Sequence, residues 1–154
     1  MTHSFEFISQ HPDETIQLGK RLAKYLRRGD IVCLEGDLGT GKTTLTKGIA
    51  QGLRVTSEYI HSPTFVLMNI YEGKIPLYHF DFYRLEDPHQ IAAIGYEEFL
   101  YGRGVAVIEW AERLGELTPQ ARLEVKISHQ GENSRKFEFF ARGDRYQQLL
   151  KMVL

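Results

Sequence analysis

Cysteine is almost absent from this sequence, and long apolar runs are missing altogether. Cys33 is the only cysteine among 154 residues, so no disulfide can form within the chain and no cluster of thiolates can bind zinc. No segment approaches the roughly 20 apolar residues that a helix needs to cross a bilayer. The N-terminus also lacks a basic stretch followed by an apolar run. We therefore expect a reducing, cytoplasmic environment and no membrane association.

The sequence has no excess of charge of either sign. Lys and Arg number 19, Asp and Glu number 20, and the formal net charge at pH 7 is -1. A chain without global positive charge cannot hold nucleic acid by general phosphate neutralisation, so any RNA contact must be local or made through another protein. The length and the 42% of hydrophobic residues predict one globular domain over residues 1–154.

The periodicity of apolar residues predicts alternating helices and strands. Residues 15–27 have mostly helical spacing, and the continuous apolar run at 31–34 suits a strand buried on both faces. Further helices are predicted at 43–53, at 88–100 with an interruption at Gly95, and at 145–154; a second buried strand is predicted at 105–108, and hairpins at 65–82 and 123–142.

A glycine-rich loop stands between the first buried strand and the helix after it. Residues 36–43 satisfy the pattern G-x-x-x-x-G-K-[ST] in full. Glycine lets successive backbone N–H groups face the phosphates of a nucleotide, and Lys42 can reach the β and γ phosphates. The Thr43 hydroxyl can bind magnesium at a helix N-terminus. The pattern should arise by chance in roughly one chain of this length in two hundred, so ATP with Mg2+ is the predicted ligand.

The predicted fold class follows from the order strand, glycine loop, helix. We expect an α/β fold of three layers, like that of the P-loop NTPases, with a mixed sheet. The strands that end at the loop and at Glu109 should be parallel, and the hairpins should add antiparallel strands. Asp37 is expected to be solvated because a buried carboxylate would repel phosphates, and its side chain has no assigned role. The residues of the nucleotide-binding loop are Gly36, Asp37, Leu38, Gly39, Thr40, Gly41, Lys42, Thr43 and Thr44.

Two carboxylates compete for the second half of the site. Phosphoryl transfer on such a loop usually needs a carboxylate at the end of a neighbouring buried strand to hold magnesium. Glu109 follows the apolar run 105–108, although a glutamate that only ends a strand at the surface is the alternative. Asp81, within HFDFYR, is the rival, with a turn or helix-capping role as its own alternative. Either carboxylate can contact the metal while the other orients the attacking water.

Other side chains near these motifs each admit two interpretations. His79 suits a proton shuttle but is more often a structural group on a half-buried strand. Arg84 can approach the γ phosphate or form an ordinary ion pair. Ser62 and Thr64 can place a hydroxyl on magnesium, as switch loops do, or use it to hydrogen-bond their own backbone in a proline turn. Trp110 can pack in the core or anchor a partner.

Together the motifs resemble those of the TsaE family. The resemblance rests on GDLGTGKTT at 36–44, SPTF at 62–65, HFDFYRL at 79–85 and IEW at 108–110, in the family's order and spacing. It implies a small bacterial ATPase that acts with TsaD and TsaB in making threonylcarbamoyladenosine beside the anticodon of tRNA. It also implies that TsaD performs the modification chemistry, that ATP hydrolysis resets the complex, and that tRNA is reached indirectly through it.

The resemblance also implies roles for individual residues. Lys42 of the nucleotide loop is expected to be catalytic, Thr43 and Glu109 to be the magnesium ligands, and Asp81 to be the functional aspartate. Trp110 matches a family tryptophan near the nucleotide and the partner surface. Three more residues are expected near the nucleotide or its adenine: Ser9, Thr15 and Arg135.

Two other functions share the loop and stay open. A small-molecule kinase would carry an arginine-bearing lid, and no arginine-rich insertion is evident. A nucleotide-dependent switch that reads guanine would carry N-K-x-D and D-x-x-G after the loop; neither is present, which favours ATP over GTP. Basal ATP hydrolysis is expected to be slow and controlled by partners, because the motifs assure no general base or arginine finger.

Overall fold

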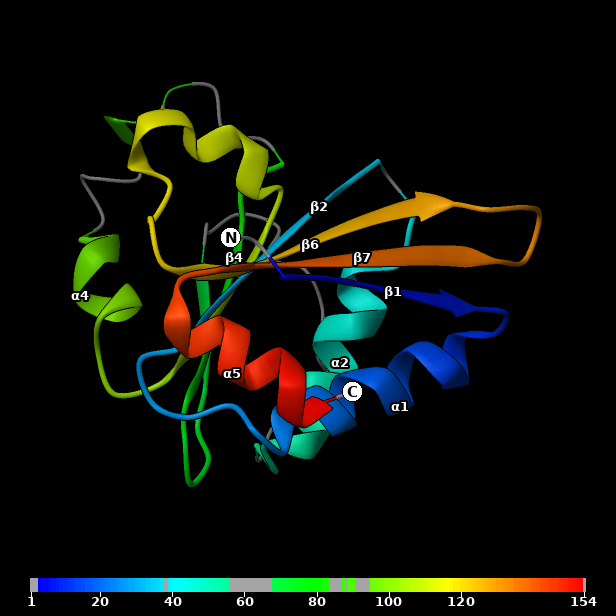
Figure 1. The fold of residues 1–154 in the computed structure, drawn as a ribbon. Helices are drawn as coiled ribbons and strands as arrows, with labels where there is room; N and C mark the ends of the chain where they lie inside the picture. Colours follow the sequence, from blue (N-terminus) through cyan, green and yellow to red (C-terminus); the bar gives the residue numbers. More distant parts are fainter. Residues whose placement is uncertain are drawn as a thin grey trace.

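The computed structural model describes residues 3–37, 39–55, 68–83, 87, 89–90 and 95–153. These residues form a seven-stranded mixed sheet with helices on both faces (Figure 1), and the predicted α/β class is confirmed. The elements are β1 (His3–Ser9), α1 (Pro12–Ala23), β2 (Ile31–Gly36), α2 (Lys42–Gly52), β3 (Met68–Tyr71), β4 (Leu77–Asp81), α4 (Tyr96–Leu100), β5 (Val105–Glu109), the 3-10 helix η1 (Ala111–Leu117), β6 (Arg122–His129), β7 (Arg135–Arg142) and α5 (Asp144–Val153).

The sheet has a parallel centre between antiparallel edges. Its strand order is β1-β7-β6-β2-β5-β4-β3. The expected parallel pairing of β2 with β5 is confirmed, and both hairpins are antiparallel within themselves. The expectation was incomplete in one respect, because β4 runs parallel to β5 and β6 runs parallel to β2. The carboxyl ends of these four strands therefore meet at one edge of the sheet, where α/β proteins bind ligands.

Strand β1 was not predicted. It pairs antiparallel with β7 along its whole length, and its Phe5 and Phe7 pack against Phe139 and Phe137. Alternation of Phe5 and Phe7 with polar neighbours was the available signal for a half-buried strand. The pairing brings residues 3–9 beside β7 and places Ser9, the last residue of β1, close to the glycine loop.

Two apolar cores lie on opposite faces of the sheet. Helices α1, α2 and α5 cover the larger core, which includes Leu22, Leu45 and Leu149, and α4 and η1 cover the smaller one. Helices α1 and α2 approach closely because Gly48 has no side chain: a Cβ there would lie 2.4 Å from a backbone oxygen of α1. Among the described residues no helix is long and apolar enough to cross a membrane.

The helix boundaries differ from the predicted ones for local reasons. Helix α1 begins at Pro12 because the His11 side chain caps it by accepting the Asp13 N–H at 3.1 Å, and proline at the first helical position needs no N–H partner. Helix α4 begins after Gly95, which has a left-handed φ of 71°. The predicted helical residues Pro88 and 91–94 lie outside the described part of the chain.

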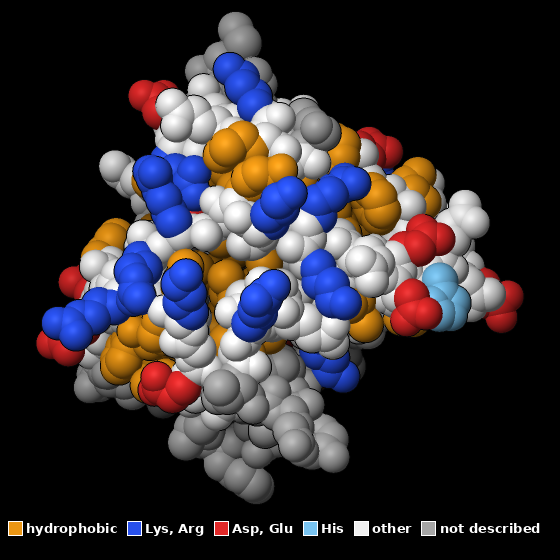
Figure 2. Space-filling model, turned by 90° about the horizontal axis from the view of Figure 1, so that it is seen from below, with side chains coloured by type: hydrophobic (Ala, Val, Ile, Leu, Met, Phe, Trp, Pro, Cys, Tyr) orange, Lys and Arg blue, Asp and Glu red, His pale blue; other side chains and the backbone are white. Residues whose placement is uncertain are grey.

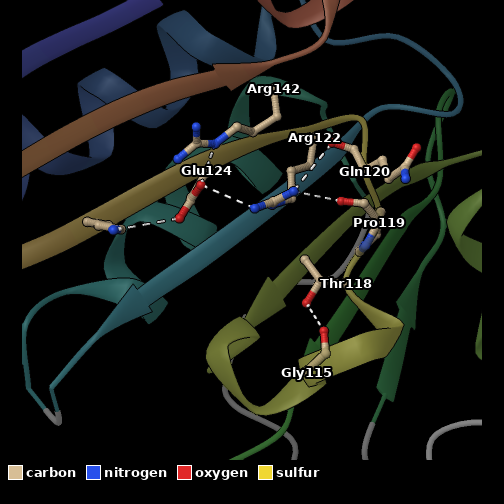
Figure 3. Close-up of polar contacts among 8 residues, drawn as sticks. Gly115, Thr118, Pro119, Gln120, Arg122, Glu124 and Arg142 are labelled. Carbon is tan, nitrogen blue, oxygen red and sulfur yellow. Dashed lines mark hydrogen bonds and ion pairs between the residues drawn. The ribbon is translucent and has the colours of Figure 1, made fainter. Parts of the chain in front are cut away.

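A buried ionic network stiffens the sheet on the face away from α1 and α2 (Figure 3). The Glu124 carboxylate of β6 is 4% exposed and accepts hydrogen bonds from Arg142 Nε at 2.8 Å and Arg122 Nη2 at 3.3 Å. Burial raises the pKa of Glu124, but the Arg142 hydrogen bond and the surrounding cations outweigh it and hold the pKa below 4.5. Arg122 also donates to the carbonyl of Pro119 at 2.8 Å, which fixes the loop that leads from η1 to β6.

Candidate functional site

The glycine loop lies between β2 and α2, as the sequence predicted. Gly41 caps α2 with a left-handed φ of 113°, and Gly36 ends β2 with a φ of 151°. A Cβ at Gly36 would lie 2.4 Å from the carbonyl oxygen of Ile127, so the loop can leave the sheet only through a residue without a side chain. The Thr40 hydroxyl donates to the Asp37 carbonyl at 2.8 Å and tightens the turn.

Lys42 is buried under the loop. Its Nζ donates to the carbonyl oxygens of Gly36 and Asp37 at 2.6 and 2.8 Å, and it lies 4.0 Å from the centroid of the Trp110 ring. Burial lowers the pKa of Lys42 below its ordinary value of 10.5, although four nearby carboxylates, led by that of Glu109, act in the opposite direction. Among the described residues no carboxylate forms an ion pair with Lys42, and its ammonium group lies against the loop carbonyls, where an anion bound at the loop could reach it.

Glu109 lies between the loop helix and the neighbouring strand. The Thr43 hydroxyl, in the first turn of α2, donates to Glu109 Oε1 at 2.9 Å. The second carboxylate oxygen, Oε2, pairs with His79 Nε2 of β4. Glu109 is 2% exposed and His79 is fully buried, so the alternative of a surface glutamate at a strand end is wrong. His79 is a buried partner of Glu109, which favours the structural interpretation over an exposed proton shuttle.

The donor set suits magnesium. Thr43 and Glu109 present two oxygen ligands to one point at the helix N-terminus, and magnesium prefers oxygen and takes only one or two protein ligands beside waters and phosphates. The described residues contain no group of three or more His, Cys, Asp or Glu side chains that could hold a metal alone. Any metal here would therefore depend on a nucleotide for its remaining ligands.

Asp81 stands beside Glu109 in the sheet. The two residues are in register on the parallel strands β4 and β5, and in-register side chains of neighbouring strands point to the same face. Asp81 Oδ1 accepts the backbone N–H of Tyr83 at 3.0 Å, which is the turn role weighed for it. Both carboxylates therefore lie at the carboxyl edge of the sheet.

Three side chains that follow β5 complete the rim of the site. Trp110 has a left-handed φ of 60° and stacks on Tyr83 with ring centroids 5.0 Å apart. Glu112 accepts the Gly36 N–H at 3.4 Å, and the Arg113 guanidinium lies 5.9 Å from the Trp110 ring. Sequence reasoning missed Glu112 and Arg113. Their position just after a buried parallel strand was the signal that could have found them.

A cleft of about 470 Å³ opens beside the glycine loop. It brings together residues that are far apart in the sequence, because β1 ends and the antiparallel β7 begins beside the loop, with Ser9 paired with Arg135. Ser9 and Thr15 are buried at one wall, with their hydroxyls 2.8 Å apart. The expected residues Ser9, Thr15 and Arg135 all line the cleft, together with Gln10, His11, Pro12, Gly39, Thr40, Gly41, Thr44 and Asn133.

Several residues singled out in the sequence lie outside the described part of the chain. They are Leu38 of the loop, Ser62 and Thr64 of the SPTF segment, and Arg84. Their predicted roles stay predictions.

Fold and site together define a P-loop type of α/β protein: a central parallel strand leads through a glycine loop to a helix whose first turn faces the carboxylate of the next strand. The sequence matches the family described as "Threonylcarbamoyl adenosine biosynthesis protein TsaE" over residues 9–137. The chain belongs to the TsaE family.

Relatives of known name agree with this assignment. The tRNA threonylcarbamoyladenosine biosynthesis protein TsaE of Bacillus subtilis is 44% identical over 140 residues, which cover 90% of this chain and 87% of that protein. The protein of the same name from Nostoc is 44% identical over 131 residues, 82% of this chain and 79% of its own. The crystal structure of Bacillus subtilis YdiB superimposes with a TM-score of 0.87 at 37% identity, covering 99% of this chain and 95% of that one.

Proposed function

We propose that this protein is a magnesium-dependent ATPase that supports threonylcarbamoyladenosine modification of tRNA together with TsaD and TsaB. The observation that carries the proposal is the meeting of Lys42, Thr43 and Glu109 at the N-terminus of α2. These three side chains supply the cation, the hydroxyl and the carboxylate that phosphoryl transfer on a glycine loop requires. The names of the relatives from Bacillus subtilis and Nostoc supply the link to tRNA modification.

ATP phosphates would bind at the loop, where the backbone N–H groups and the dipole of α2 favour anions. Lys42 would turn from the Trp110 ring toward the β and γ phosphates. Since burial depresses its pKa, an incoming polyanion would stabilise its charged form. The cleft beside the loop would take the adenosine, with Arg135 and the Ser9–Thr15 pair at its walls.

Magnesium, when bound with the nucleotide, would neutralise charge that develops on the phosphates. Thr43 and Glu109 would hold it, directly or through water, and His79 would keep the Glu109 carboxylate oriented. Asp81, in register with Glu109, would orient the attacking water. Since the sequence motifs assure no general base or arginine finger, we expect slow hydrolysis in the isolated protein and stimulation by TsaD and TsaB in the cytoplasm.

ATP turnover tests the proposal directly. Phosphate release is measured for the protein alone and with TsaD and TsaB, for wild type and for Lys42→Ala, with Lys47→Ala as the matched control because Lys47 is an exposed lysine on the same helix. We expect stimulation by the partners and a loss of about 100-fold or more in Lys42→Ala. Unchanged turnover in Lys42→Ala, or equal loss in both variants, would contradict the assignment.

A further inference from the structure

Basic side chains gather at the end of the molecule opposite the glycine loop. Figure 2 shows Lys and Arg side chains spread over this face, with Asp and Glu mostly at its margins. The face is built from the C-terminal parts of α1 and α2, the turn before β2, the β3–β4 hairpin and the turn before β5. Its basic residues, here called the basic end, are Lys20, Arg21, Lys24, Arg27, Arg28, Arg54, Lys74 and Arg103.

Contacts between these segments make the basic end continuous. Arg28 donates through Nη1 to the carbonyl of Arg103 at 2.7 Å and through Nη2 to the carbonyl of Lys74 at 2.8 Å. One guanidinium thus joins three segments that are far apart in the sequence. The backbone of Arg54 lies against the tip of the β3–β4 hairpin, and the backbone of Lys20 lies against the end of α2.

Acidic side chains do little to neutralise the basic end. In the segments 17–30, 47–55, 71–76 and 101–104, the only carboxylates are those of Asp30 and Glu72. Asp30 is 3% exposed, and its oxygens accept hydrogen bonds from Arg145 Nη2 and Nε at 2.7 and 3.0 Å. The Asp30 carboxylate therefore neutralises Arg145, which is not part of the basic end. Asp13 and Glu14 line a pocket together with Lys20 and Arg21, but for the other six basic residues of the set the one exposed carboxylate in these segments is that of Glu72, in a chain whose net charge is -1.

Folding alone does not account for this arrangement. The dipole of α1 explains Lys20 and Arg21, which lie in its last turn. The turn residues Arg27 and Arg103 and the hairpin residue Lys74 belong to no such helix end, and bringing like charges together destabilises a fold. The ATP phosphates are not their ligand, because α2, with 11 residues, separates the two ends of the molecule by about 16 Å.

We propose that the basic end binds the phosphate backbone of tRNA directly. The proposal rests on the role in tRNA modification but not on ATP hydrolysis. Lysine and arginine dispersed over several segments suit a backbone that carries regularly spaced charges, and Lys24 and Lys74 are exposed. The local patch supplies the positive field that the chain as a whole lacks.

Binding of a fluorescently labelled, unmodified tRNA transcript to the full-length protein, measured by anisotropy at several salt concentrations, tests the proposal. The variant Lys24→Gln/Lys74→Gln removes two charges from the basic end. The control Lys126→Gln/Lys136→Gln removes two lysine charges from β6 and β7, outside the segments of the basic end. We expect the first variant to bind about tenfold or more weakly at low salt and to reduce the slope of log affinity against log salt by about 1.4 to 1.8. The control should bind like wild type.

Equal weakening in both variants would show a general charge effect and overturn the proposal, as would absence of tRNA binding by the wild type at low salt. Tighter binding of a polyglutamate peptide than of tRNA would also overturn it and assign the face to an acidic protein. Lys42→Ala separates this proposal from the ATPase: it should lose ATP turnover and keep tRNA binding. Thermal unfolding of each variant checks that it is folded.

Discussion

Removing the imidazole of His79 should destabilise the protein and loosen its proposed magnesium site. The Glu109 carboxylate is 2% exposed, and its two oxygens have separate partners: Thr43 Oγ1 at one and His79 Nε2 at the other. The substitution His79→Leu keeps an apolar side chain of similar bulk in the site but deletes the partner of Glu109 Oε2. A buried carboxylate oxygen is then left without its hydrogen bond.

The expected magnitude follows from two opposing effects. Removing one partner of a buried ionic or charge-assisted pair costs about 3 to 5 kcal/mol. His79 Nδ1, however, has no hydrogen-bond partner among the described residues, and deleting a buried unsatisfied nitrogen returns about 1 to 2 kcal/mol. We therefore expect the free energy of unfolding to fall by about 1 to 4 kcal/mol, or roughly 2 to 16 °C in Tm for a chain of this length.

Urea and thermal unfolding measure the loss, and two further variants test its cause. His79→Gln places an amide donor near the position of Nε2 and should recover part of the stability. In the double variant His79→Leu/Glu109→Leu neither partner remains, so it should be more stable than the sum of the single losses predicts. A loss below about 0.5 kcal/mol in His79→Leu, or strict additivity in the double variant, would refute the role given to the pair.

Three other perturbations have outcomes that the structure sets. Gly36→Ala should cost about 3 kcal/mol in urea unfolding, because its methyl group would lie 2.4 Å from a carbonyl of β6; Gly131→Ala, with open space around it, is the control and should change little. Burial raises the pKa of Tyr146 to about 12, so its stabilising effect is complete below about pH 10 and is lost as the pH rises through 12; Tyr146→Phe should flatten that decline in stability. The Glu124 pKa lies below its usual value, so its contribution is present above about pH 4.5 and lost in acid. Glu124→Gln should cost about 2 kcal/mol at pH 7 and converge with wild type at low pH; a constant difference across the pH range would contradict this.

Local features of the sequence determined the part of the site that lies on continuous chain. Residues 31–53 contain the buried strand, the glycine loop and α2 in unbroken order. Each of these depends on the spacing of apolar residues and on the backbone freedom of glycine, which are properties of residues that are neighbours in the sequence. The strand at 105–108, which the structure extends to Glu109, was likewise predicted from its unbroken apolar run. Strand β1 was not predicted, although Phe5 and Phe7 alternate with polar residues, because a short half-buried strand is identified only when its partner is known.

The tertiary structure decided which of these pieces meet. The glycine loop and Glu109 could be proposed as partners from sequence, but the pairing of Glu109 with His79 and the register with Asp81 depend on β4 lying parallel to β5. The cleft likewise forms only because β1 lies beside β7. The basic end forms only because three segments distant in the sequence meet, and Arg28 connects them by hydrogen bonds to the carbonyls of Arg103 and Lys74. A sequence specifies spacing along one chain, whereas these contacts depend on the order and direction of strands in the sheet.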